Sequence, residues 1–126
     1  MIAPEIIRHA LLSLGTEDDF GLYEALGNTD RINPAGKGRD NLASTQAALT
    51  WLIDKGWITI RESHDSKTAR ALPDSEALAV LKRPESFELP AGVGPGLVFG
   101  ASPQGERAYR DGTCCPSNPK RQRKPK

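Results

Sequence analysis

The segment Leu49–Ile60, with the sequence LTWLIDKGWITI, is the feature of this chain that most constrains its fold. Its first half has the apolar spacing of an amphipathic helix. Gly56 follows Lys55 and is a strong signal for the end of a helix. The residues after it, Trp57–Arg61, alternate and include β-branched side chains, which is typical of a strand. A helix must therefore pass directly into a strand at Gly56, so the chain is predicted to mix α and β structure.

Weaker patterns of the same kind predict the other elements. Helices are expected over Pro4–Leu14, residues 16–26, Pro73–Leu81 and from Ser102 to about Gly112. A further helix is expected to be capped by Asp40 or Asn41 and to run to about Lys55. Strands are expected over Trp57–Arg61, Thr68–Leu72 and Gly96–Gly100. Gly15 is expected to end the first helix, Thr16 to cap the second, and residues 28–40 to form a loop. The predicted core consists of Leu11, Leu14, Leu26, Leu42, Leu49, Leu52, Ile53, Ile58, Ile60 and Phe99.

Charge divides the chain into two parts. Residues 113–126 hold five basic residues and no acid, whereas residues 1–112 hold 12 basic and 16 acidic residues, a net charge of −4. An acidic body argues against a strongly basic, sequence-independent DNA binder, because such binding depends on neutralising phosphates. The sequence therefore predicts one folded domain over residues 1–112 and a disordered basic tail over residues 113–126, which could itself meet polyanions.

Several classes of protein are not expected. No apolar run approaches the roughly 18 residues of a membrane span, and the N-terminus does not resemble a signal peptide, so a cytoplasmic protein is expected. Cys114 and Cys115 are adjacent and are the only cysteines, which fits neither a disulfide framework nor a structural zinc site. We expect no metal and no cofactor.

No constellation of catalytic residues is visible either. The sequence Gly36-Lys37-Gly38 lacks the spacing of a phosphate-binding P-loop. The carboxylates of residues 17–19 stand where the start of a helix favours acids, which gives them a structural role. We therefore expect a binding protein, not an enzyme, with no catalytic residue.

Two stretches resemble parts of a winged helix-turn-helix domain. Leu49–Ile60 resembles the end of the recognition helix and the first wing strand. Leu97–Tyr109 is similar to the returning wing strand and the helix after it, with Ser102 and Gly105 at the helix start. The resemblance covers about residues 4–111 and is shared with uncharacterised winged-helix-like proteins of actinobacteria and their phages.

This resemblance implies an α+β fold of three helices, a small antiparallel wing sheet with an inserted helix, and a C-terminal helix. The inserted helix and a stretch rich in proline and glycine occupy Pro73–Pro95, where a simple wing has only a short loop.

The resemblance also implies a DNA-binding transcriptional regulator with double-stranded DNA as its partner. Ser44 and Thr45 would then face base edges. Six basic residues would contact phosphates, and these are Arg31, Lys37 and Arg39 before the recognition helix and Arg61, Lys67 and Arg70 in the wing.

The alternative is a winged-helix scaffold for protein–protein interaction, as an adaptor or a phage-encoded modulator. The acidic body and the interrupted wing favour this alternative. Winged-helix regulators often dimerise, so a homodimer is a further possibility. The sequence contains no heptad repeat that would indicate a coiled-coil dimer interface.

Overall fold

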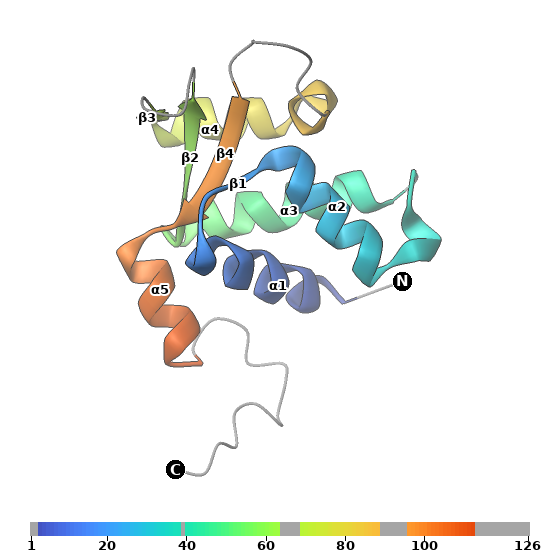
Figure 1. Ribbon diagram of the computed structural model, residues 1–126, viewed down its shortest axis with the longest axis horizontal. Coiled ribbons are helices and arrows are strands. Elements are labelled where there is room, and N and C mark those ends of the chain that lie inside the picture. Colours follow the sequence, from blue (N-terminus) through green and yellow to red (C-terminus); the bar gives the residue numbers. More distant parts are fainter. Residues whose placement is uncertain (1–2, 39, 64–68, 89–95, 113–126) are drawn as a thin grey trace.

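The computed structural model describes residues 3–38, 40–63, 69–88 and 96–112 of the chain (Figure 1). Within these residues there are five α helices, two short 3-10 helices and one four-stranded sheet. The helices are α1 (Pro4–Glu17), α2 (Leu22–Ile32), η1 (Pro34–Gly36), α3 (Asn41–Asp54), α4 (Asp74–Leu81), η2 (Pro84–Phe87) and α5 (Pro103–Arg110). The strands are β1 (Phe20–Gly21), β2 (Ile58–Ser63), β3 (Ala69–Ala71) and β4 (Gly96–Ala101). The α+β class predicted from the sequence is confirmed.

The predicted passage from helix to strand is also confirmed. Helix α3 ends at Asp54, and Gly56 adopts a φ of +76°, a conformation that favours glycine. The N–H of Gly56 donates to the carbonyl oxygen of Ile53 at 2.9 Å, and the N–H of Trp57 donates to that of Leu52 at 2.9 Å. These bonds satisfy carbonyl groups at the end of α3. Strand β2 therefore leaves α3 in a fixed direction.

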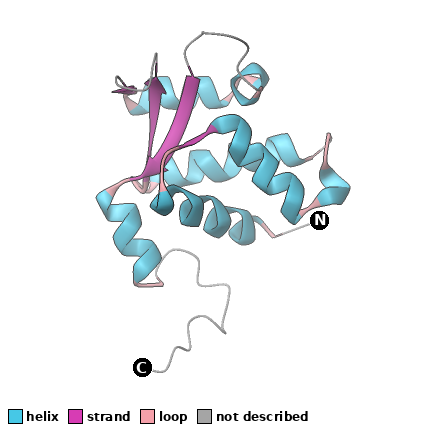
Figure 2. Cartoon of the chain, viewed as in Figure 1, coloured by secondary structure: helices cyan, strands magenta, loops and turns pink. Residues whose placement is uncertain are grey.

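The sheet has the strand order β1-β4-β2-β3, with neighbouring strands antiparallel. Strands β2 and β4 form its centre, where Ile60 lies opposite Phe99 and both side chains are buried. Figure 2 shows these strands beside the helices α1, α2 and α3, with α4 passing behind their upper part and α5 below their lower end. The three predicted strands are present with shifted ends. Strand β1 was not predicted, because two residues are too few to show alternation.

Helix α1 runs further than the sequence predicts. It continues through Gly15 to Glu17, so the prediction that Gly15 ends the helix is wrong. A Cβ at Gly15 would lie 3.1 Å from the amide nitrogen of Ala101 in β4. Glycine at this position lets α1 approach the sheet closely. Thr16 is helical and its hydroxyl donates to the carbonyl oxygen of Ser13 at 2.7 Å, so it does not cap the second helix.

Helix α2 is shifted along the chain in the same way. It begins at Leu22 and ends at Ile32, whereas the sequence predicted a helix over residues 16–26 followed by a loop. Thr29, which was assigned to a loop, is fully buried in this helix against α3. Packing against α3 stabilises the last turn, so the predicted loop over residues 28–40 shortens to a few residues around η1.

The hydrophobic core lies between α1, α2, α3 and the sheet. The predicted core residues that are buried are Leu11, Leu49, Leu52, Ile53, Ile58, Ile60 and Phe99. The other three, Leu14, Leu26 and Leu42, are only partly buried and pack against this core. Large buried hydrophobic residues that the prediction left out are Ile7, Leu12, Leu22, Leu72, Leu81 and Phe87, and four alanines, Ala25, Ala48, Ala77 and Ala108, are buried as well.

The segment between β3 and β4 folds back onto the domain. Leu81 of α4 and Phe87 of η2 belong to the core, and the Nε2 of Gln46 in α3 donates to the carbonyl oxygen of Leu81 at 2.8 Å. The inserted helix predicted from the sequence is therefore an integral element that packs beside α3 (Figure 1).

Helix α5 starts as predicted, with the Ser102 hydroxyl accepting a hydrogen bond from the Gly105 N–H at 3.0 Å. The basic tail, Arg39 and Lys67 lie outside the described residues.

Candidate functional site

Thr45, which was predicted to face base edges, is turned into the protein. It is 0% exposed. Its hydroxyl is hydrogen-bonded to the Thr29 hydroxyl at 2.8 Å and to the carbonyl oxygen of Asn41 at 2.8 Å. The prediction for Thr45 is wrong, because α3 is buried over a wide arc that includes Asn41 and Ala48 as well as the leucine stripe. Thr45 therefore links α3 to α2, and its buried side chain cannot contact DNA.

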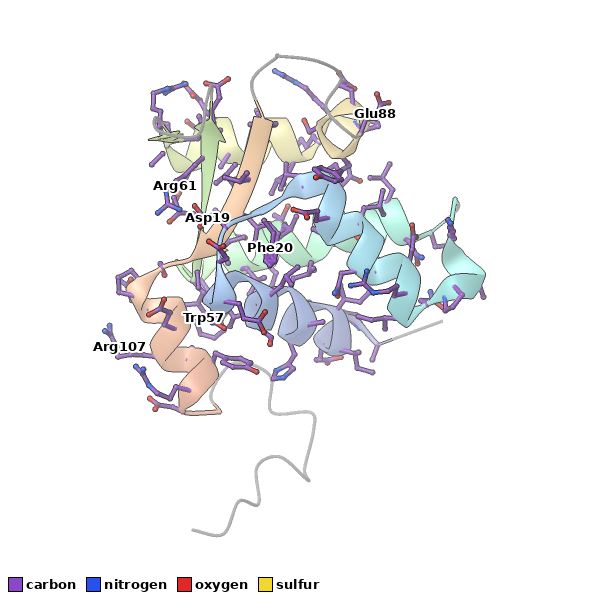
Figure 3. All side chains as sticks on the ribbon, in the orientation of Figure 1. Asp19, Phe20, Trp57, Arg61, Glu88 and Arg107 are labelled. Atoms are coloured by element: carbon purple, nitrogen blue, oxygen red, sulfur yellow. The ribbon has the colours of Figure 1, made fainter. Side chains whose placement is uncertain are left out.

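The two described basic residues of the predicted wing are held by acids. The Nη1 of Arg61 in β2 lies 2.9 Å from the Oδ2 of Asp19, and the two side chains point toward each other in Figure 3. The Nη2 of Arg70 in β3 lies 3.1 Å from the Oε1 of Glu62 and 3.7 Å from that of Glu76. A phosphate would compete with these carboxylates for both guanidinium groups.

The other predicted phosphate contacts lie elsewhere. Arg31 is exposed in the last turn of α2, and Lys37 is exposed just after η1. Both stand near the start of α3, whereas Arg61 and Arg70 lie on strands beyond its end (Figure 1). A helix of 14 residues is about 21 Å long. The four described members of the predicted phosphate-contacting set thus form two separated pairs instead of one cluster.

The outward face of α3 carries small side chains beside a hollow. Ala43 and Ala47 are exposed, and Ser44 is half-buried between them and α1. These residues and Ala48 form one wall of a hollow of about 490 Å³. The first turns of α1, including Ile7 and Arg8, form the other wall. Ser44 therefore reaches the surface as predicted, but it does so within this hollow.

A second hollow of about 460 Å³ lies on the other side of Ala47. It is lined by residues of α3 such as Thr50, Trp51 and Asp54, together with Leu81 and Lys82 at the end of α4. Ala47 and Arg8 line both hollows. We call the two hollows together the α3 groove; it is bordered by α1 and α4 and has Ala43, Ala47 and Thr50 along its length.

Arg8 occupies the boundary between the two hollows. Its guanidinium carbon lies 4.4 Å from the centroid of the Trp51 ring, and the Nζ of Lys55 lies 5.2 Å from the same centroid. Both are cation–π distances. The Nε of Arg8 is buried and has no hydrogen-bond partner among the described residues. Arg8 is thus a cation that its stacking on Trp51 holds at this boundary.

The sequence alone singled out neither Arg8 nor Trp51. The two residues are far apart in the chain and meet because α1 packs on α3. No pattern of neighbouring residues in the sequence predicts this contact between Arg8 and Trp51. This part of the groove can therefore be recognised only from the three-dimensional structure.

Comparisons of the chain with protein-family models, with curated protein sequences and with solved structures find no significant match. No group of three or more His, Cys, Asp or Glu side chains in the described ranges is placed to hold a metal ion. Among those same residues, no helix is long and apolar enough to cross a membrane. The α3 groove is therefore judged by its own geometry and charge.

Proposed function

We propose that this chain is an interaction module of winged-helix type that binds a partner protein through the α3 groove. The order of elements supports the winged-helix part of the proposal. Helix α3 passes directly into β2, and β4 returns antiparallel beside β2 from Ile58↔Ala101 to Ser63↔Gly96. Strand β1 then pairs with the other edge of β4. In this proposal β2 and β4 are the wing strands, and α4 is the helix inserted between them.

The observation that carries the functional part is the character of the outward face of α3. Helix α3 contains no lysine or arginine, and its exposed positions include Ala43 and Ala47 beside an open hollow. Readers of the major groove usually present side chains that hydrogen-bond to base edges. A concave surface with a small apolar wall is instead suited to receive a side chain from a partner.

The distribution of charge supports a protein partner as well. Residues 1–112 have a net charge of −4, and Arg61 and Arg70 are already paired with carboxylates. Affinity for DNA grows with the number of phosphates that a protein neutralises. The proposal retains the cytoplasmic location expected from the sequence and replaces direct transcriptional regulation with an adaptor or modulator role.

The test is a salt titration of affinity for a short fluorescent DNA duplex, measured by anisotropy. Wild-type protein is compared with a full-length variant whose tail charges are removed by substitution with glutamine. The substituted residues are Lys120, Arg121, Arg123, Lys124 and Lys126. We expect the tail variant to lose DNA binding, because the block of five basic residues without an acid is then gone.

A steep salt slope that persists in the tail variant would overturn the proposal. Under DNA binding by the folded domain, Arg31→Ala or Lys37→Ala in that variant should reduce the slope by about one unit each. Under the proposal neither substitution changes the result, since there is no binding left to weaken.

A further inference from the structure

We infer that the segment bound in the α3 groove is an acidic amphipathic peptide of the partner protein, with a large aliphatic side chain and a carboxylate close together. This inference rests on the proposed function and specifies the chemistry of its partner. Two features of the groove carry it: a hollow with small apolar residues on its wall, and a fixed cation at the boundary of that hollow.

The aliphatic side chain is required by the hollow between α1 and α3. Three alanines of α3, Ala43, Ala47 and Ala48, line it opposite Ile7. Alanine side chains end at Cβ, so they do not fill the hollow, and a space of about 490 Å³ is left between α1 and α3. Burial of apolar surface there is favourable at roughly 25 cal/mol per Å². A leucine or isoleucine side chain fits within this space and would bury its apolar surface against these residues.

The carboxylate is required by the charge around the groove. Arg8 lines both hollows, Lys82 lines the second, and Lys55 flanks Trp51. Asp54 is the acidic residue that lines the second hollow. The stacking of Arg8 on Trp51 holds its guanidinium in place at the boundary of the two hollows. A carboxylate is the acceptor that pairs most strongly with a guanidinium.

The same charges disfavour the chain's own tail as the occupant. Residues 113–126 carry five basic residues and no acid, so they would bring like charge to Arg8, Lys55 and Lys82. A second copy of the chain and a DNA duplex remain as outcomes that the experiment must separate from an acidic peptide.

The experiment uses a displayed library of random peptides as the probe. The bait is the full-length variant with the five tail charges replaced by glutamine, so that acidic peptides cannot be selected by the tail. We expect the enriched peptides to combine acidic residues with leucine or isoleucine. Ala47→Arg should place a long side chain in the groove and weaken their binding by about tenfold or more. Arg8→Gln should weaken it by about 10-fold to 100-fold, as loss of a charged hydrogen bond implies.

Two substitutions provide matched controls. Ala79 is, like Ala47, an exposed helical alanine, and Arg83 is an exposed arginine; both lie by a different hollow, beside β3 and β4. Ala79→Arg and Arg83→Gln should leave peptide affinity within about twofold, because neither residue borders the α3 groove. Thermal melts of all four variants check that they are folded, and Arg8→Gln tests the inference even if Ala47→Arg unfolds the domain.

Three results would overturn the inference: no enriched peptide, enriched peptides that are basic, or affinities that do not depend on Arg8 and Ala47. A dimer in sedimentation that Ala47→Arg dissociates would assign the groove to a second copy and overturn it too. These results leave the proposed function intact as long as the tail variant does not bind DNA. If the DNA affinity of the tail variant instead falls steeply with salt, both the proposed function and this inference are overturned.

Discussion

Replacement of Asn41 by alanine removes a side chain that ties α2 and η1 to the start of α3. Asn41 is fully buried. Its Nδ2 donates to the Oδ1 of Asp30 at 2.8 Å and to the carbonyl oxygen of Asn33 at 2.9 Å. Its Oδ1 accepts from the Nδ2 of Asn33 at 3.1 Å. Gly36 packs so closely that a Cβ there would clash with this oxygen. Asn41→Ala therefore breaks three hydrogen bonds at once.

The expected cost follows from the kinds of hydrogen bond lost. A bond between neutral groups contributes about 0.5–1.5 kcal/mol, and a bond to a charged group about 1.5–3 kcal/mol. Two bonds of Asn41 join neutral groups, and the third reaches the carboxylate of Asp30. Their sum is about 2.5–6 kcal/mol. This is a large part of the stability of about 5–15 kcal/mol that a small domain has.

The free energy of unfolding should be measured by urea titration followed by circular dichroism. Asn28→Ala in α2 is the matched control, because the Oδ1 of Asn28 is buried but makes no hydrogen bond within the described residues. That substitution should cost less than about 1 kcal/mol, since alanine also has the better helix propensity. The reasoning is refuted if Asn41→Ala destabilises the domain no more than Asn28→Ala does.

Further predictions concern the core, two glycines and one ion pair. Leu49→Ala should cost about 2–5 kcal/mol in urea unfolding, because Leu49 is fully buried; a loss below about 1 kcal/mol would contradict its assignment to the core. Gly27→Ala should raise the melting temperature, since its Cβ meets nothing within 4 Å in the middle of α2. Gly105→Ala should lower it, since its Cβ would clash with the Trp57 carbonyl; equal shifts would refute the packing argument. A double-mutant cycle on Asp19 and Arg61 should give a coupling below about 1 kcal/mol that falls with salt, because both side chains are partly exposed. A larger, salt-independent coupling would contradict that.

The sequence predicts those parts of the fold in which a few neighbouring residues determine the backbone. Gly56 ends α3 and Ser102 caps α5, because each signal acts within its own turn. Gly15 was wrongly predicted to end α1. It stays helical, and its lack of a side chain lets α1 approach β4 closely. The stop predicted after Gly27 failed for a related reason, as packing of Thr29 on α3 continues the helix.

The candidate site was less predictable because it depends on which faces of the helices meet. Thr45 was predicted to be exposed because only the leucine face of α3 around Leu49 was expected to be buried. In the structure α2 also covers the adjacent face of α3, which carries Thr45. Arg8 and Trp51 carry no shared local pattern, and only the packing of α1 on α3 brings them together. Phe87 lies in a stretch rich in proline, where periodicity gives no signal for burial.

The most direct measurement is amide chemical-shift mapping on the isotope-labelled full-length tail variant. One titration uses an acidic peptide enriched in the selection, and the other uses a DNA duplex. We predict that the peptide shifts the amides of Ala43, Ala47 and Thr50 along the α3 groove, while the duplex shifts none of them. Shifts produced by the duplex at Arg31, Lys37, Arg61 and Arg70, with no response of the groove to the peptide, would contradict the account.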